Sequence, residues 1–203
     1  MKKFTLLMVA LLITTLSIAQ ALSGTYKVGV TEVAPNFTSL GAAVTALNTN
    51  GVAGDVILEI TSDITEAANI GLGVNTNGFG ITIRPDVDAD RKITFTQLAD
   101  NTSPTGHFVI GYPTSGLTAG WSDANTIATN NVIIDGYALG GTTRRLTFTN
   151  TNADHKNARM IMVVGACQNT VIKNCIINNL TTNTGSPFCV GAVVRKGVAI
   201  EVA

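Results

Sequence analysis

The residues that could do chemistry in this chain of 203 residues are few and lie apart in the sequence. Asp135 is the lone carboxylate of an apolar stretch, and Arg144 and Arg145 precede the next apolar stretch without a matching set of acidic residues. His155 lies in a polar stretch, where solvent would surround it. Hydrolysis of a glycosidic bond needs paired carboxylates, and proton abstraction needs a positioned base. We therefore predict that this chain contains no catalytic site and uses no cofactor.

Three carboxylates alternate at Asp86, Asp88 and Asp90, which is the spacing that opens a calcium-binding loop. Such a loop needs Gly at its sixth position and a bidentate Glu at its twelfth. These positions hold Arg91 and Gln97. The pattern therefore favours a solvated turn, and no metal site is predicted.

The cysteines are Cys167, Cys175 and Cys189, so at most one internal disulfide can form. Cys175 lies in an apolar stretch, which predicts a small side chain that faces the interior. A disulfide between Cys175 and Cys189 is the alternative. No C-x-x-C spacing and no neighbouring His accompany them, so the sequence supports neither a zinc site nor a redox motif.

Residues 101–130 form the longest stretch without a strong pattern, interrupted only by an apolar run at 107–111. This stretch carries Tyr112, Asp123 and the single Trp of the chain, Trp121. Long loops on a rigid scaffold often carry binding residues, and an exposed aromatic ring can stack on a sugar. These three residues are the candidate ligand-binding residues, with a polysaccharide or cell-surface glycan as the partner. Alternatively, Trp121 folds back and covers the scaffold.

Residues 131–179 consist of short apolar runs that end in Asn or Gly. Runs of about five residues rich in Val, Ile, Thr and Phe suit strands and are too short for stable helices. No link resembles a two-residue hairpin turn, so an antiparallel meander is not favoured. Asn at strand ends can adopt left-handed backbone angles and stack on an Asn in a neighbouring coil, which is typical of a coil that repeats on itself. The runs are NVIIDG (131–136), LTFTN (146–150), MIMVVG (160–165), TVIKN (170–174) and CIINN (175–179), and the Asn residues concerned are Asn150, Asn174, Asn178 and Asn179.

The succession of VIIDG, GGTTRRLTFTN, an apolar strand and NTVIKNCIINN resembles the coils of right-handed parallel β-helices of the pectin-lyase-like superfamily. With the opening GTYKVG and the segments PNFTSLGAAVTALNTNGVAGDVILEI, ITIRPD and RKITFT, the chain resembles the β-helical regions of large secreted surface proteins of the Bacteroidetes type. The resemblance implies an all-β fold, a right-handed parallel β-helix (solenoid) with a short N-terminal capping α-helix. It implies a scaffold and secretion rather than one activity. The hydrolase motifs of the superfamily, N-T-D, D-D, G-H-G and R-I-K, are absent from the sequence.

Residues 1–21 have the organisation of a signal peptide. Two lysines are followed by an apolar core, and Ala19-Gln20-Ala21 has the small residues of a cleavage site. Cleavage after Ala19, which leaves Gln20 first, fits nearly as well. A single membrane helix is the alternative, but the apolar core is short and contains polar residues. We predict a secreted protein, extracellular or at the cell surface, whose mature chain has no membrane span.

Residues 22–54 are predicted to form an N-terminal strand and the capping helix, and residues 55–203 to form the β-helix coils. Apolar residues recur at helical spacing up to Asn48, Thr38 or Ser39 can cap the start of a helix over 39–48, and Gly51 ends the pattern. Such a helix would cover the apolar end of the first coil.

The composition of the chain limits its partners. Lys plus Arg is 13 and Asp plus Glu is 13, so the net charge is zero and no electrostatic footprint for nucleic acid is present. The 29 Thr and 18 Asn residues suit stacked polar ladders. Strand alternation continues to Ala203 without a polar cap, which predicts an incomplete set of coils at the C-terminus and a longer native product.

Two functional hypotheses follow. The first is a secreted or cell-surface β-helical structural or adhesion module that contacts glycans and has no catalytic site of its own. The second is the N-terminal portion of a polysaccharide lyase or glycoside hydrolase whose catalytic residues lie beyond residue 203. The sequence leaves the oligomeric state open.

Overall fold

The computed structural model describes residues 20–96, 105–112, 126–151, 158–178, 192–194 and 200–202. Within them the chain is mostly β-strand, with a helix, α2 (Leu40–Asn50), near the start. The strands are β1 (Leu22–Val28), β2 (Val52–Ile60), β3 (Ile64–Glu66), β4 (Ile70–Leu72), β5 (Ile81–Pro85), β6 (Arg91–Phe95), β7 (Thr105–Ile110), β8 (Val132–Asp135), β9 (Leu146–Asn150), β10 (Ala158–Val163), β11 (Thr170–Lys173), β12 (Ile176–Asn178), β13 (Ala192–Val194) and β14 (Ile200–Val202).

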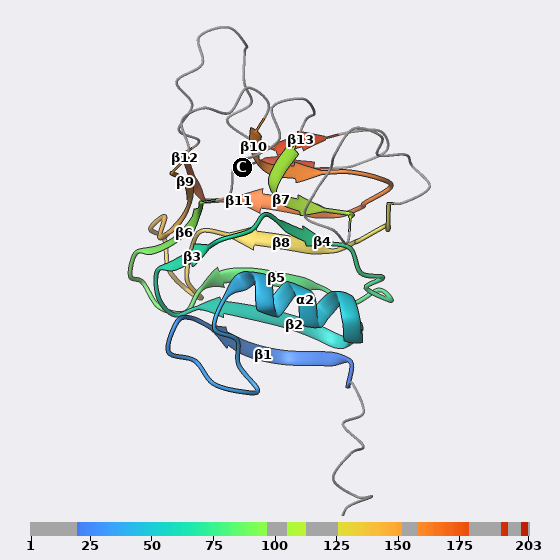
Figure 1. Cartoon of the computed structure of the whole chain (residues 1–203), viewed down its shortest axis with the longest axis horizontal. Helices are drawn as coiled ribbons and strands as arrows, with labels where there is room; N and C mark the ends of the chain where they lie inside the picture. Colours follow the sequence, from blue (N-terminus) through green and yellow to red (C-terminus); the bar gives the residue numbers. More distant parts are fainter. Residues whose placement is uncertain are drawn as a thin grey trace, which may run out of the picture.

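The strands form three parallel sheets that the chain visits in turn. The first sheet has the order β1-β2-β5-β8-β11-β14, the second β3-β6-β9-β12, and the third β4-β7-β10-β13. From β2 onward, each strand pairs in parallel with the strand three positions further along the chain. In Figure 1, β2, β5, β8 and β11 lie as successive layers above β1. The prediction of a mostly β structure with parallel strands is confirmed.

Residue alternation explains which side chains enter the interior. In β5 and β9 every second residue is buried, as expected for strands with one face on a core. Ile81 pairs with Val56 and with Val132, so the same interior position is apolar in three successive layers of the first sheet. Phe95 and Phe148 fill the interior from the second sheet, and Phe108 fills it from the third. Stacking in register therefore produces one continuous core.

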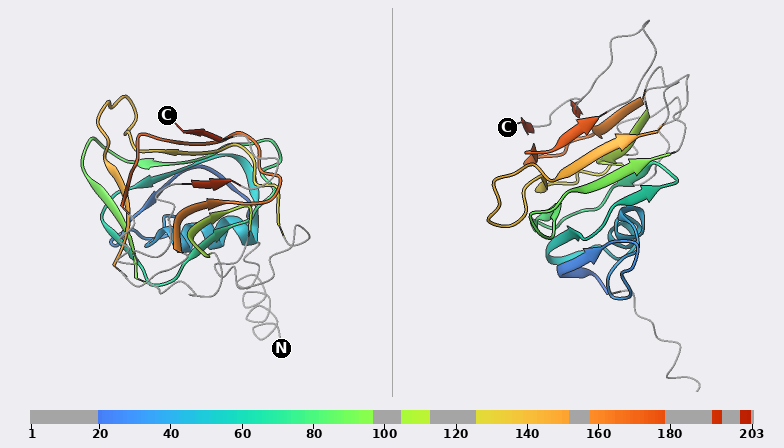
Figure 2. Two further views of the ribbon diagram at one scale, coloured as in Figure 1. Left: turned by 90° about the horizontal axis from the view of Figure 1, so that it is seen from above. Right: turned by 90° about the vertical axis from the view of Figure 1, so that its left-hand side faces the viewer.

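Helix α2 covers one end of this core, as predicted. The Ser39 Oγ accepts a hydrogen bond from the Ala42 N–H at 3.1 Å, and Gly51, at φ 74°, ends the helix with its N–H donating to the Leu47 carbonyl at 2.9 Å. Leu40, Ala43, Val44 and Leu47 are buried. Figures 1 and 2 show α2 at the β1 end of the stacked sheets, across the opening that they surround.

The sequence predicted most strands to within about two residues, the usual uncertainty of strand ends. The runs ITIRP and LTFTN coincide with β5 and β9. Strand β3 was not predicted, because it has three residues and includes a carboxylate, Glu66, that is buried. The predicted signal peptide lies outside the described residues except for its last two positions. In the described part of the chain, no helix combines the length and apolarity needed to cross a membrane.

The left-handed angle predicted for Asn at strand ends is confirmed for Asn174, which has φ 57° and donates to Asp135 rather than to an Asn, and it is wrong for Asn150 and Asn178. Asn150 closes β9 with a buried side chain instead. Asn131 and Asn169 also adopt left-handed angles, at φ 57° and 56°, directly before β8 and β11. Asn179 lies outside the described residues.

Candidate functional site

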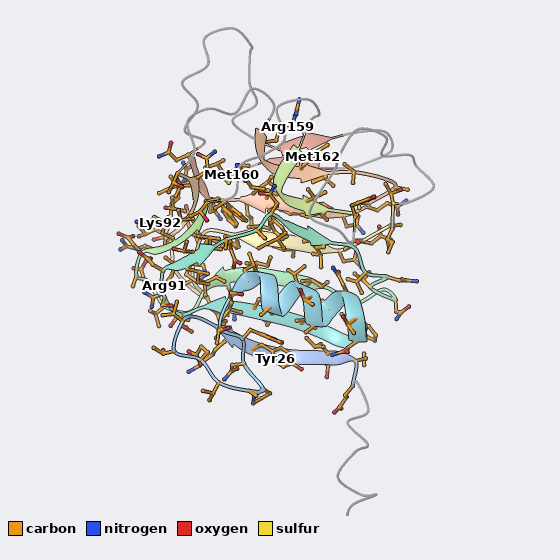
Figure 3. All side chains as sticks on the ribbon, viewed as in Figure 1. Tyr26, Arg91, Lys92, Arg159, Met160 and Met162 are labelled. Carbon is orange, nitrogen blue, oxygen red and sulfur yellow. The ribbon has the colours of Figure 1, made fainter. Side chains whose placement is uncertain are left out.

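Tyr112 follows β7 on the outer side of the third sheet. Its half-exposed side chain packs against Val109, Met162 and Val164, which are buried on the face of the sheet that points away from the main core. Met162 is labelled on β10 in Figure 3. Gly111 sets the position of Tyr112: its φ is 94°, and a Cβ there would collide with the Val164 carbonyl oxygen. Tyr112 is thus a half-exposed ring held at a fixed place.

Trp121 and Asp123, the other two candidate ligand-binding residues, lie outside the described residues. Of the three, the structure locates Tyr112 alone. Contact with a glycan in this region stays a prediction. The face of an aromatic ring such as that of Tyr112 can stack on a sugar.

Asp135, the lone carboxylate considered for catalysis, is fully engaged within the fold. Its carboxylate accepts hydrogen bonds from the Tyr137 N–H at 3.0 Å and the Asn174 Nδ2 at 2.9 Å, and it pairs with the Lys173 Nζ at 3.2 Å. Burial raises the pKa of Asp135, but these three donors outweigh burial and lower it below its ordinary value. A carboxylate stabilised in this way is a weak base, so its role is to hold the turn after β8 in place.

Two of the alternating carboxylates after β5, Asp88 and Asp90, are exposed, in agreement with the predicted solvated turn, and all three form ion pairs that the sequence did not predict. Arg145 contacts Asp88 at 2.8 Å and Asp90 at 3.0 Å, and Arg91 contacts Asp86 at 2.9 Å. The hydrogen bonds that Arg145 donates to Asp88 and Asp90 raise the pKa of Arg145. The acidic partners of Arg145 lie one layer earlier in the stack, which is why the local sequence around Arg145 did not reveal them.

Charged residues on the outer face of the first sheet also alternate in sign across the strands. Lys27 pairs in register with Glu59, and Glu59 with Arg84, whose Nη2 lies 2.8 Å from the Glu59 Oε1. Further along the stack, Asp135 pairs in register with Lys173. Opposite charges on neighbouring strands stabilise the stacking, and they leave no field of one sign for a charged ligand.

The two described thiols are poor nucleophiles. Cys175 is a free thiol that packs against the core, as predicted, and burial together with the nearby Asp135 raises its pKa to about 12. Burial also raises the pKa of Cys167. Cys175 is a free thiol, so it does not form the alternative disulfide with Cys189, and Cys189 lies outside the described residues. Neither thiol would be ionised to a useful degree at neutral pH.

The sequence did not reveal that His107 and Glu66 are buried. His107 lies in the interior, with its Nδ1 2.8 Å from the Asn69 Oδ1 and its Nε2 3.2 Å from the Asn150 Nδ2. Its ring stacks on Phe95 with centroids 5.4 Å apart. Glu66 is also buried, and its Oε1 accepts a hydrogen bond from the Gly41 N–H at 3.1 Å in the first turn of α2. Both residues satisfy polar groups inside the fold, so neither is exposed to a substrate.

The charged groups of the described chain are thus arranged for internal pairing. Across residues 20–96, 105–112, 126–151 and 158–178, no three His, Cys, Asp or Glu side chains gather closely enough to hold a metal ion. His155 lies outside the described residues. Searches of protein-family models, of curated proteins and of solved structures each find no match to this chain.

Proposed function

We propose that this chain is a secreted or cell-surface structural or adhesion module, built as a right-handed parallel β-helix, that contacts glycans and has no catalytic site of its own. The observation that carries the proposal is the strict order of the strands. Each of the three sheets receives every third strand in parallel register. A chain that repeats such a circuit grows along one axis and presents long outer faces, which suits display and adhesion.

The state of the charged residues supports a scaffold over an enzyme. Asp135, Glu59 and the carboxylates near Arg145 each have a basic or hydrogen-bonding partner inside the fold. A general acid and base need open access to a substrate and a pKa near the working pH. The lowered pKa of Asp135 is the opposite of what a general acid requires.

The glycan contact is assigned to the region of Tyr112, Trp121 and Asp123. The support for it is the half-exposed ring of Tyr112, fixed over the outer cluster of the third sheet. The net charge of zero makes contact through hydroxyl groups and ring faces the suitable chemistry.

Export is tested by expressing the chain with a C-terminal tag and measuring its cellular fraction and intact mass. We expect a tagged product outside the cytoplasm that has lost residues 1–19 or 1–21. A full-length product confined to the cytoplasm would contradict export.

The lack of catalysis is tested with the same secreted product. Release of reducing ends and of unsaturated products is measured on acidic and neutral polysaccharides, with and without calcium. We expect no release. Product formation that a chelator abolishes would replace the proposal with a lyase.

A further inference from the structure

A groove of about 380 Å³ lies at the β1 end of the molecule, and Tyr112 is not among the residues that line it. Tyr26 from β1, together with Pro35 and Phe37 from the loop after β1, forms its aromatic and apolar wall. Ala46 and Asn50 contribute the outward side of α2. Figure 3 shows Tyr26 beside β1 beneath the stacked sheets. Small-molecule sites usually have volumes of about 300–1,000 Å³, so this groove has the size of a site for one small ligand.

The aromatic wall is held rigidly. The rings of Tyr26 and Phe37 have centroids 5.5 Å apart at an angle of 47°, and both side chains pack against the core. The Phe37 N–H donates to the Lys27 carbonyl at 2.9 Å, and the Phe37 carbonyl accepts from the Gly29 N–H at 2.9 Å. The loop that carries Phe37 is therefore fixed to β1, and the wall is formed before any ligand arrives.

The polar groups of the groove can serve a ligand. The Tyr26 hydroxyl oxygen accepts a long hydrogen bond from the Ser23 N–H at 3.4 Å, which leaves its own proton to donate elsewhere. The side-chain amide of Asn50 is half-buried and makes no hydrogen bond to any other described residue. The Tyr26 hydroxyl, which can donate, and the Asn50 amide, which can donate and accept, thus belong to residues that line the same groove.

The side chains that line the groove are all neutral, and removal of the signal peptide adds one charge there, the new α-amino group of Gln20 or Leu22. An amine would lose hydration there without gaining a counter-charge, and a phosphate or uronate would meet the α-amino group but no charged side chain. A wholly apolar ligand would leave the Asn50 amide and the Tyr26 hydroxyl unpaired. A neutral sugar has C–H groups for the ring faces and hydroxyls for the amide and the phenol, so it satisfies both parts of the lining.

We propose that this groove binds a neutral saccharide, one or two hexose units in size, with a sugar ring against Tyr26 and Phe37. The site is separate from the Tyr112 region, so either glycan contact can fail without the other. Gln20 and Ala21 also line the groove. Cleavage of the predicted signal peptide after Ala19 keeps Gln20 and Ala21, and cleavage after Ala21 removes them and widens the groove. The other side of the lining, Tyr26, Phe37, Ala46 and Asn50, remains in both cases.

The test is saturation-transfer and chemical-shift NMR on the secreted chain, with maltotriose, cellotriose and mannotriose as neutral probes and trigalacturonate as the charged one. We expect saturable binding of at least one neutral trisaccharide, with shifts of the Tyr26 ring protons. Ala46→Phe places a ring inside the groove and should weaken that binding by about tenfold or more, since the ligand and the new side chain would compete for the same volume.

Ala42→Phe is the matched control, because Ala42 is an exposed residue one turn earlier on α2 that does not line the groove. We expect binding by Ala42→Phe to equal that of the unmodified chain. Asn50→Ala, which keeps the aromatic wall, should weaken binding without changing the thermal midpoint of unfolding. The proposal is overturned if the folded chain binds no neutral probe, if Ala46→Phe binds as well as Ala42→Phe, or if trigalacturonate is the probe that shifts Tyr26. Loss of binding in Tyr112→Ala alone would move the saccharide site to the third sheet.

Discussion

Asn169 donates a hydrogen bond from its Nδ2 to the Oδ1 of Asn131 at 2.9 Å, and both residues have left-handed backbone angles. They occupy the same turn in successive layers of the first sheet, directly before β11 and β8. The Asn131 Nδ2 in turn donates to the Gly78 carbonyl at 3.1 Å and the Phe79 carbonyl at 3.3 Å, in the turn before β5. Three successive turns are therefore linked by side-chain amides in addition to backbone hydrogen bonds.

This link predicts that Asn131→Ala destabilises the chain. Alanine would keep the strain of a positive φ and lose the amide bonds, so we expect the free energy of unfolding to fall by about 1–3 kcal/mol. Asn131→Gly relieves the strain and loses the same bonds, so its loss should be smaller. Urea unfolding measures both variants. Full stability in Asn131→Ala would contradict a structural role for the link.

The raised pKa of the buried Glu66 carboxylate should make the stability of the chain depend on pH. Burial raises the pKa of Glu66, and hydrogen bonds from the Gly41 and Leu40 N–H groups lower it only in part. Because its folded-state pKa lies above the unfolded value, the folded state binds the extra proton more tightly. Its contribution to stability is therefore complete below the unfolded pKa, about 4.3, and decreases as pH rises through the higher folded value.

Glu66→Gln removes this titration. We expect the pH dependence of the urea midpoint above pH 4 to flatten in this variant, and Asp63→Asn, at an exposed carboxylate, controls for the loss of one charge. An unchanged profile in Glu66→Gln would show that another group causes the dependence.

The parts of this fold that the sequence predicted are those in which a residue's neighbours along the chain decide its environment. ITIRP and LTFTN alternate β-branched or aromatic residues with polar ones, and they form β5 and β9 with the expected faces inward. Ser39 and Gly51 delimit α2 because capping depends on a few adjacent residues.

The parts that were missed depend on contacts between layers. Arg145 binds Asp88 and Asp90, which precede it by 57 and 55 residues. Asn150 was expected to adopt left-handed backbone angles, but its side-chain amide contacts the buried His107 ring instead. The wall of the groove joins β1, the following loop and α2. These contacts between layers depend on the number of residues in each loop, which the local periodicity of the sequence does not determine.

Cys175 should resist modification while the chain is folded. Its pKa, raised to about 12, leaves almost no thiolate at pH 7–8, and the thiol packs against the core. With Cys189→Ser removing the thiol outside the described residues, we expect a maleimide to label Cys175 slowly in buffer and rapidly in denaturant, as measured by peptide mass spectrometry. Rapid labelling in buffer would contradict the burial, and a Cys175–Cys189 disulfide in the unmodified chain would favour the alternative that the sequence left open.

The edge of β1 predicts a role for Asn36 in keeping molecules apart. β1 is the end strand of the first sheet, and an unpaired edge can recruit another strand. The Asn36 Oδ1 accepts a hydrogen bond from the Lys27 N–H at 2.9 Å, and the next residue, Phe37, donates its N–H to the Lys27 carbonyl at 2.9 Å. Both polar groups of Lys27 that would pair with an added strand are thus already occupied.

Asn36→Ala exposes the Lys27 N–H and loosens the segment that covers it. We expect this variant to self-associate at lower protein concentration than the unmodified chain, as measured by sedimentation velocity over a concentration series. Thr31→Ala, at an exposed position in the same loop, should behave like the unmodified chain. Equal association in both variants would mean that the loop as a whole, rather than the hydrogen bond of Asn36, protects this edge, since only the Asn36 change removes an acceptor from the β1 backbone.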